Sequence, residues 1–290
     1  MNLFHTVKIG KISTIINPLV FAYKYIAKTI IRKLKDFVIS LFEKDNLFYA
    51  QNHWIEIVGK TSESPIAQHK IHELETTLFV RNYLKKGDCV FDIGSNIGYF
   101  TLEFARLVGE SGRIYSFEPH PEIFEVLKRN VKRNRYKNIT LINAACGEHN
   151  GSQNLYFSTE NEGNHKIIES KNSNGSVEVQ IRTLTEFVKE NRPRLIKMDI
   201  EGAELLALKG ISEELIFNNN IDFIIEYHPY EMSFFGINGS EVIDFFTKRG
   251  YKFRDLASHD FPSISPEELL EKYKKESFGI TNLFCSKSID

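Results

Sequence analysis

Short apolar runs alternate with longer amphipathic runs through most of the chain. The short runs predict strands at Cys89–Ile93, Arg113–Phe117, Thr140–Asn143, Arg194–Met198, Asp222–Glu226 and Thr281–Ser286. Apolar positions spaced three and four apart predict helices at His69–Leu84, Tyr99–Val108, Glu122–Asn134 and Ala203–Leu208. Strands that alternate with helices in this way indicate an α/β fold with a mainly parallel, doubly wound sheet covered on both faces.

Two regions depart from this alternation. Residues 152–182 carry turns rich in Asn, Gly and Ser between short strand-like runs, which predicts a β insertion over the site. Between Leu19 and Leu41, apolar residues recur at helical spacing while basic residues gather on the opposite side. We therefore expect an N-terminal helical extension over residues 1–60 and a single catalytic domain over residues 61–290.

The basic amphipathic helix at 19–41 has two interpretations. It could attach the protein to a membrane surface, or it could dock on its own catalytic domain or on a dimer mate, which is the commoner use of such helices. The longest uncharged run, Ile12–Tyr23, is too short to cross a bilayer, which needs about 20 apolar residues, and no cleavage site of a signal peptide follows it. Three cysteines without metal-ligand spacing indicate reduced core thiols. We expect a cytoplasmic protein, with contact to the inner membrane face as the alternative for this helix.

The segment Val90–Phe100 joins a buried strand to a helix through a glycine turn. This junction is where doubly wound domains bind nucleotide-like cofactors. Only Gly94 and Gly98 are glycines, and Asn96 stands where a dinucleotide-binding loop needs another glycine. A pyrophosphate would also meet the charge of Asp92, a repulsion of about 4 kcal/mol at ~4 Å and an effective dielectric constant of ~20. The loop therefore favours a cationic ligand such as S-adenosylmethionine.

The next predicted strand ends at Glu118, which lies 24 positions after Gly94. A carboxylate at about this spacing binds the ribose hydroxyls of a bound nucleotide. Ordinary structural roles for Asp92 and Glu118 are credible one at a time, but their joint spacing around a glycine turn favours a cofactor site. The complete set of expected cofactor-binding residues is Asp92, Gly94, Ser95, Asn96, Gly98, Tyr99, Glu118, Asn143 and Ala144, with Asn143 and Ala144 beside the adenine and Ser95, Asn96 and Tyr99 around the methionine.

The motifs quoted so far resemble those of the FkbM-type methyltransferases, a family of S-adenosylmethionine-dependent O-methyltransferases. The resemblance covers roughly residues 70–285 and is most specific at Ile196–Glu204, which reads Ile-Lys-Met-Asp-Ile-Glu-Gly-Ala-Glu. It extends to Asn143–Gly147, Val179–Phe187, Phe223–Pro229 and Thr281–Phe284. The resemblance implies the Rossmann-like class I methyltransferase fold, S-adenosylmethionine as cofactor, and methyl transfer to a hydroxyl of a small molecule or glycan.

Polar residues at the ends of two later strands are the candidates for catalysis. Asp199 and Glu201 follow one strand, and His228 follows the next. His228 is the best candidate base because imidazole titrates near pH 6.5, while Asp199 could replace it or orient the acceptor. Alternatively, Glu201 is a first-turn carboxylate that complements a helix dipole, and His228 is an ordinary residue at a strand end. A divalent ion held by Asp199, Glu201 and Glu226 is a further alternative that no spacing indicates.

Two rival functions remain open at this point. An NAD-dependent oxidoreductase is disfavoured by Asn96 and Asp92, as argued above. A non-catalytic scaffold, anchored to a membrane by its basic helix, is disfavoured because Asp92, Glu118 and Asp199 are all present. The net charge is −1, and residues 1–50 hold 8 Lys and Arg against 3 Asp and Glu, so the remaining chain is acidic and we expect no nucleic-acid partner.

Overall fold

The computed structural model describes residues 30, 33–34, 46–58, 65–158, 173–218 and 220–289. The chain divides into two compact units, residues 1–45 and 46–290. The predicted basic helix at 19–41 lies outside the described residues except at 30, 33 and 34, so its role stays a prediction. Within the described residues, no helix is both long enough and apolar enough to cross a membrane.

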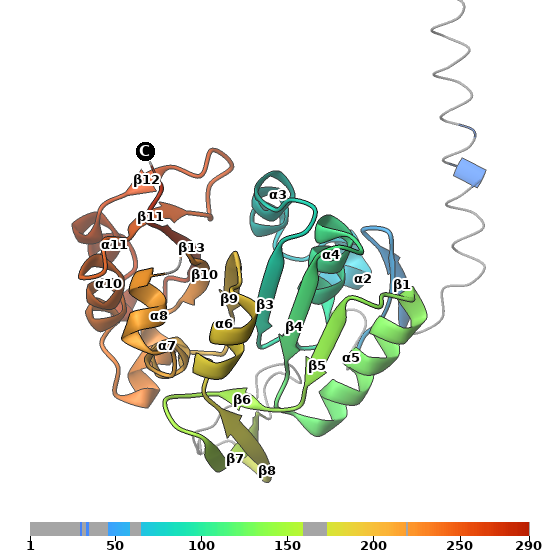
Figure 1. Cartoon of the computed structure of the whole chain (residues 1–290), viewed down its shortest axis with the longest axis horizontal. Coiled ribbons are helices and arrows are strands. Elements are labelled where there is room, and N and C mark those ends of the chain that lie inside the picture. The colour runs from blue at the N-terminus through green and yellow to red at the C-terminus, as the bar shows by residue number, and fades with distance from the viewer. Residues whose placement is uncertain are drawn as a thin grey trace, which may run out of the picture. The chain divides into compact units, whose positions relative to one another are not determined.

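An eight-stranded sheet forms the centre of the larger unit (Figure 1). Its strands lie in the order β12 (Ser263–Ile264), β11 (Lys252–Asp255), β13 (Thr281–Ser286), β10 (Asp222–Tyr227), β9 (Leu195–Met198), β3 (Cys89–Ile93), β4 (Arg113–Phe117) and β5 (Ile139–Ile142). The pairs from β10 through β5 are parallel, whereas β13 runs antiparallel to both β10 and β11. The predicted Rossmann-like class I methyltransferase fold, with its mainly parallel doubly wound sheet, is confirmed.

Strand alternation sends side chains into a separate apolar core on each face of the sheet. On one face the core includes Phe91, Ile196 and Phe223. The helices on this face are α6 (Thr185–Asn191), α7 (Glu204–Lys209), α8 (Glu213–Asn218), α10 (Gly239–Thr247) and α11 (Pro266–Lys272). On the other face Val90 and Ile224 belong to the second core. Its helices are α2 (Pro65–His69), α3 (Leu74–Tyr83), α4 (Tyr99–Val108) and α5 (Pro121–Asn134).

The helix expected at His69–Leu84 begins five residues later, as α3 at Leu74, and ends at Tyr83. Helix α2 ends at His69 and α3 begins at Leu74, and between them Lys70 and Glu73 have left-handed φ values of 58° and 43°. The sequence did not reveal where α3 begins, because a left-handed backbone at a residue other than glycine leaves no sequence signal. The break between α2 and α3 places Glu73 at the start of α3, where it contributes to the site described below.

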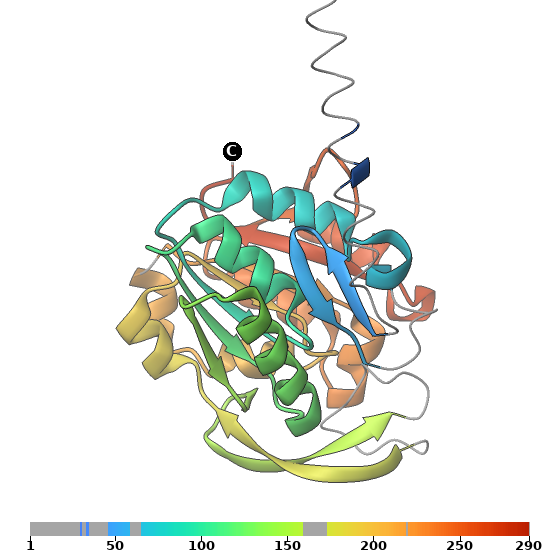
Figure 2. The same cartoon turned by 90° about the vertical axis from the view of Figure 1, so that its right-hand side faces the viewer.

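The expected β insertion is a separate three-stranded sheet, with β8 (Ser173–Arg182) between β6 (Ala145–Cys146) and β7 (Gly151–Ser158). β7 and β8 are antiparallel and form the long curved ribbon along the lower edge of Figure 2. Since β6 follows the carboxyl end of β5 almost directly, the insertion begins at the sheet edge where ligands bind in this fold.

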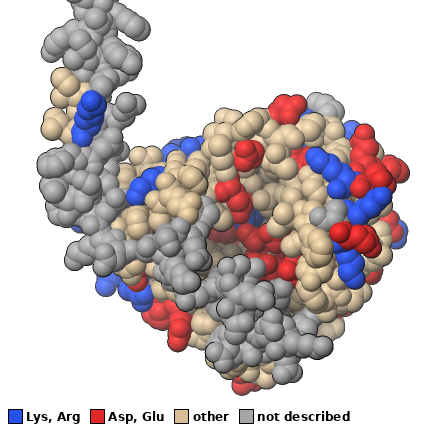
Figure 3. Space-filling model, turned by 180° about the vertical axis from the view of Figure 1, so that it is seen from behind, with Lys and Arg blue, Asp and Glu red and all other residues tan. Residues whose placement is uncertain are grey.

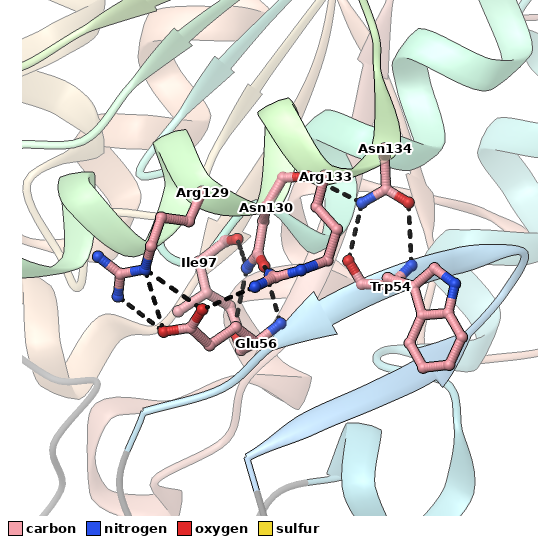
Figure 4. A network of polar contacts seen from close by, with 7 residues as sticks. All are labelled: Trp54, Glu56, Ile97, Arg129, Asn130, Arg133 and Asn134. Atoms are coloured by element: carbon pink, nitrogen blue, oxygen red, sulfur yellow. Dashed lines mark hydrogen bonds and ion pairs between the residues drawn. The ribbon is translucent and has the colours of Figure 1, made fainter. Parts of the chain in front are cut away.

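A hairpin made by β1 (Leu47–Ala50) and β2 (His53–Glu56) belongs to the larger unit and not to the extension expected over residues 1–60. Two asparagines of α5 bind the outer edge of β2 (Figure 4). Asn130 accepts from Glu56 N at 2.7 Å and donates to Glu56 O at 2.9 Å, and Asn134 bonds Trp54 N and O at 2.9 and 2.7 Å. The two side-chain amides bind the backbone N–H and C=O groups of β2 that a neighbouring strand would otherwise bind, so this edge of the hairpin is not left open.

Candidate active site

The glycine turn after β3 lies directly against the end of β9. Gly94 has φ 81°, and a Cβ atom there would lie 1.9 Å from the carbonyl oxygen of Asp199. The backbone N–H groups of Gly94 and Ser95 both donate to Phe117 O, at 3.0 and 2.9 Å. Gly98 has φ 95°, and a Cβ there would lie 2.5 Å from Leu127. The turn therefore depends on glycine at 94 and 98, as expected for a loop that lets a ligand approach the backbone.

Glu118 lies at the end of β4, across from this turn. Its Oε2 accepts from the backbone N–H of Asn96 at 2.9 Å, and its Oε1 accepts from that of His120 at 2.8 Å. Burial raises the pKa of the Glu118 carboxyl to about 7, and the two N–H groups oppose that shift. The Asn143 side chain donates to Glu118 O at 2.8 Å. Three of the predicted cofactor residues, Asn96, Glu118 and Asn143, are thus brought together at one point.

Two other predicted cofactor residues have side chains enclosed beneath the turn. Asp92 is 1% exposed and accepts from the Thr101 hydroxyl at 2.5 Å, and burial raises the pKa of its carboxyl. The Ser95 hydroxyl donates to Asp92 O at 2.8 Å and lies 2.7 Å from the Ser116 hydroxyl. These side chains hold the turn in shape, and their direct contact with a ligand stays a prediction.

Tyr99 and Ala144 are also buried, at 5% and 2% exposure. The Tyr99 hydroxyl lies 3.3 Å from that of Thr77, so this ring joins α4 to α3. Ala144 follows β5 next to Asn143, which is at the surface. Both residues stay predicted members of the cofactor site.

Lys197 lies in the site, although it is not among the residues expected there from the sequence. It lies in β9 in register with Asp92, is 1% exposed, and places Nζ 2.8 Å from Asp199 Oδ2 and 4.5 Å from the centre of the Phe100 ring. Burial lowers its pKa, but the carboxylates of Asp199, Glu73 and Asp92 more than reverse that effect and leave the pKa above its usual value. The available signal was a lysine inside an apolar strand two residues before a candidate catalytic carboxylate.

Glu201 lies in a tight turn before α7. Its φ is 55° and that of Gly202 is 97°, and a Cβ at Gly202 would lie 2.5 Å from the backbone of Glu231. The interpretation of Glu201 as a first-turn carboxylate is wrong, because α7 begins at Glu204. The buried Oε1 of Glu204 accepts from Ile200 N at 3.0 Å and Gly202 N at 3.4 Å, so this carboxyl holds the turn closed.

Acidic side chains gather beyond Asp199, at the carboxyl end of β10. Burial, followed by the charges of Asp199, Glu201 and Glu204, raises the pKa of Glu226 well above its ordinary value. Burial likewise raises the pKa of Glu204 to about 7. Figure 3 shows a hollow on the back of the domain with acidic side chains gathered in it. In the described part of the chain, no group of three or more His, Cys, Asp or Glu residues is arranged to hold a metal ion.

His228, the candidate base, is half-buried at the N-cap of α9 (Pro229–Met232), directly after β10. Its ring centre lies 6.2 Å from that of Tyr230. β10 is paired with β9, so His228 and Asp199 end neighbouring strands as the sequence predicted. All three cysteines, Cys89, Cys146 and Cys285, are buried and free, which confirms the prediction of core thiols.

Comparison with known proteins agrees with this geometry. A sequence model described as the methyltransferase FkbM domain matches residues 92–253, and one for protein-L-isoaspartate O-methyltransferases matches residues 27–153. Methyltransferase 1 of Beauveria bassiana is 29% identical over 147 residues, which cover 43% of this chain and 59% of that protein. The hexuronic acid methyltransferase AglP of Haloferax volcanii is 28% identical over 147 residues, 49% of this chain and 56% of that protein.

Among solved structures, a methyltransferase FkbM from Methylobacillus flagellatus is similar with a TM-score of 0.46 and 18% identity, over 77% of this chain and 50% of that one. The chain spans between a quarter and three fifths of the length of the first curated relatives it matches. The FkbM domain match covers more than half of the 290 residues, and it includes the glycine turn, Glu118, Asp199 and His228. The chain belongs to the FkbM methyltransferase domain family.

Proposed function

We propose that the protein binds S-adenosylmethionine and transfers the methyl group to a hydroxyl oxygen of a small molecule or glycan. The observation that carries the cofactor assignment is Glu118, held by two backbone N–H groups across from the glycine turn of Gly94. Each carboxylate oxygen can accept more than one hydrogen bond, so Glu118 keeps lone pairs for two ribose hydroxyls. The adenosine would extend from there toward Asn143 and Ala144.

The charges on the other side of the turn fit the rest of the cofactor. S-adenosylmethionine supplies a methyl group on a sulfonium, and it also carries an ammonium. Lys197 is surrounded by three carboxylates, of which Asp199 is at the surface end of β9 with a quarter of its side chain exposed. A site with this excess of negative charge favours a cationic ligand.

Asp199 and His228 would serve the acceptor. One oxygen of Asp199 is fixed by Lys197 at 2.8 Å, which leaves Oδ1 to hold the acceptor hydroxyl in line with the methyl group. His228, at the end of the neighbouring strand, would take the proton that the hydroxyl loses. Lys197 acts as a positioning residue in this scheme, because it touches Asp199 and not the acceptor.

Calorimetry with S-adenosylhomocysteine and with NAD tests the cofactor assignment. We expect binding of the first ligand only, weakened in Glu118→Ala by about 1 to 3 kcal/mol, the range for a hydrogen bond to a charged group. Glu122→Ala, at a helix start four residues away, is the matched control. Unchanged affinity in Glu118→Ala would refute the ribose assignment, and preferential binding of NAD would support the oxidoreductase instead.

Turnover of the variants tests the acceptor assignment. Asp199→Asn or His228→Ala should lower turnover by about 10² to 10⁴ if the residue takes part in proton transfer, with cofactor affinity largely kept. Full activity in His228→Ala would transfer the role of base to Asp199. Loss of activity in a chelator, restored by magnesium or manganese, would show a metal-assisted reaction instead.

A further inference from the structure

Two enclosed oxygen atoms next to the proposed acceptor position lack hydrogen-bond partners. Within the described chain, Glu226 Oε2 and Asn282 Oδ1 are both shielded from solvent and accept no hydrogen bond. The two residues face each other in register on the antiparallel strands β10 and β13. Residues opposite each other in such a pair have side chains on the same face, about 5 Å apart at Cβ. Enclosed polar atoms are nearly always paired, so two adjacent exceptions need an explanation.

The Asn282 side chain has a fixed orientation. Its Nδ2 donates to Glu73 Oε2 at 2.7 Å and to Thr76 Oγ1 at 3.1 Å. Burial raises the pKa of Glu73, but Lys197 and His72 outweigh it and lower the pKa to about 2, so this carboxyl is ionised. A carboxylate can only accept hydrogen bonds, and the amide nitrogen must therefore face it. Oδ1 of Asn282 is consequently a preorganised acceptor that cannot be turned to satisfy itself.

The position of the pair in the sheet separates it from the cofactor turn. In the sheet, β10 is the second strand from β3, and β13 is the third strand from β3. At the usual spacing between strands, the pair is therefore roughly 10 to 15 Å from the turn. Glu226 is near the carboxyl end of β10, and Asn282 is near the start of β13, which begins at the same edge. The pair therefore lies on the far side of Asp199 from the cofactor turn, where the acceptor would bind.

The charges around Glu226 oppose an anionic ligand. Asp199 and Glu201 act on it electrostatically, and Glu204 adds to them once its own carboxyl is ionised, above about pH 7. Lys197, the cation among them, is already held by Asp199 and Glu73. A carboxylate ligand would meet like charges here, whereas a neutral hydroxyl can donate to both open oxygens.

An exposed aromatic surface adjoins the same strand ends. The Tyr230 ring centre lies 4.6 Å from that of Phe278 and 5.0 Å from that of Phe234, and Phe278 is 62% exposed. This surface, defined by Tyr230, Phe234 and Phe278, lies at the edge of the sheet that carries Glu226 and Asn282, because Tyr230 follows and Phe278 precedes the paired strand ends Tyr227 and Thr281 by three residues. Aromatic faces beside hydrogen-bond acceptors suit a sugar ring, which has apolar C–H faces and donor hydroxyls at its rim.

We propose that Glu226 and Asn282 form the acceptor subsite, and that they bind two neighbouring hydroxyls of a neutral sugar whose ring lies on the aromatic surface. This inference rests on the proposed function and narrows its acceptor class. A uronic acid is excluded by the surrounding carboxylates, although one relative is named for methylating a hexuronic acid.

The test uses the full chain with isotope-labelled S-adenosylmethionine and matched acceptors. The acceptors are the methyl glycosides of glucose, galactose and rhamnose, beside those of glucuronic and galacturonic acid, and mass spectrometry detects methylated products. Neutral glycosides should be methylated and uronates should not. Glu226→Leu should lower that transfer by about tenfold to a hundredfold, the change expected for one lost hydrogen bond in an enclosed site, with binding of S-adenosylhomocysteine unchanged.

The melting temperature of the variants distinguishes a binding role of Glu226 from a structural role. Because Glu226→Leu removes an enclosed atom without a partner, its melting temperature should equal or exceed that of the parent. Glu214→Leu, which removes an exposed carboxylate from α8, is the matched control. Phe278→Ala removes a ring that is 62% exposed, and it should raise KM for neutral glycosides while kcat is retained.

Each of three results would refute the proposed acceptor subsite. These are preferential methylation of uronates, full transfer activity in Glu226→Leu, and an unchanged KM in Phe278→Ala. No transfer to either series, with normal binding of S-adenosylhomocysteine, would reject the sugar acceptor and leave the cofactor assignment intact. Failure to bind S-adenosylhomocysteine would reject the proposed function itself.

Discussion

The buried carboxyl of Glu204 predicts that the protein becomes less stable as pH rises toward 8. Glu204 is 0% exposed; Oε1 accepts two backbone N–H groups, while Oε2 has no partner among the described residues. Burial raises its pKa from the ordinary 4.5 to about 7. The folded state thus keeps a proton on Glu204 up to about pH 7, whereas the unfolded state releases it near pH 4.5. Over the pH range in which the folded state binds more protons than the unfolded state, raising the pH lowers the free energy of unfolding.

The two pKa values set the size of this effect. Between pH 5 and pH 8, the Glu204 carboxyl should lower the free energy of unfolding by about 2 to 3 kcal/mol, a large part of the 5 to 15 kcal/mol typical of a domain. Glu204→Gln keeps a carbonyl oxygen for Ile200 N and Gly202 N but cannot ionise. We expect this variant to lose about 2 to 3 kcal/mol less than the parent over the same pH range.

Urea denaturation at pH 5, 6.5 and 8, for the parent and the variant, measures this difference. Glu110→Gln, which alters an exposed carboxylate in a turn, should keep the parent's pH dependence. Glu118 adds a contribution of the same sign in both proteins, since burial raises its pKa to about 7 as well, and it therefore cancels in the comparison. Parallel curves of stability against pH for parent and Glu204→Gln would show that Glu204 is ionised in the folded state, and would refute the reasoning.

Three further predictions follow from close contacts. Gly94→Ala should abolish binding of S-adenosylhomocysteine in calorimetry, because its Cβ would lie 1.9 Å from the Asp199 carbonyl; binding at parental affinity would contradict that. Lys197→Met should lower the free energy of unfolding by about 3 to 5 kcal/mol in urea, since it leaves buried carboxylates uncompensated, and an unchanged midpoint would show that the ion pair is dispensable. Asn130→Ala should release the hairpin edge and destabilise the protein by about 1 to 3 kcal/mol, with a shifted emission of Trp54, the single tryptophan; parental stability and emission would refute the bracing role.

The elements of the domain were predictable where local pattern decides structure. Strands β3, β4 and β13 and helix α4 have the limits that their apolar spacing predicts, because a buried strand or an amphipathic helix must repeat its apolar positions to reach the core. The glycine turn could be predicted too, since a left-handed backbone in contact with another chain segment admits only glycine, as at Gly94 and Gly98. The sequence itself thus determined the fold class, the glycine turn after β3 and the position of Glu118 at a strand end.

Only the tertiary structure decided what surrounds each charged group. Lys197 and Glu73 are more than a hundred residues apart in the sequence, yet they interact with each other, and Lys197 also interacts with Asp92 and Asp199. The pairing of Glu226 with Asn282 likewise depends on the antiparallel register of β13 against β10. Interactions of this kind fall off within a few ångströms and depend on burial, so they are fixed by how distant segments pack and leave no periodic signal in the chain.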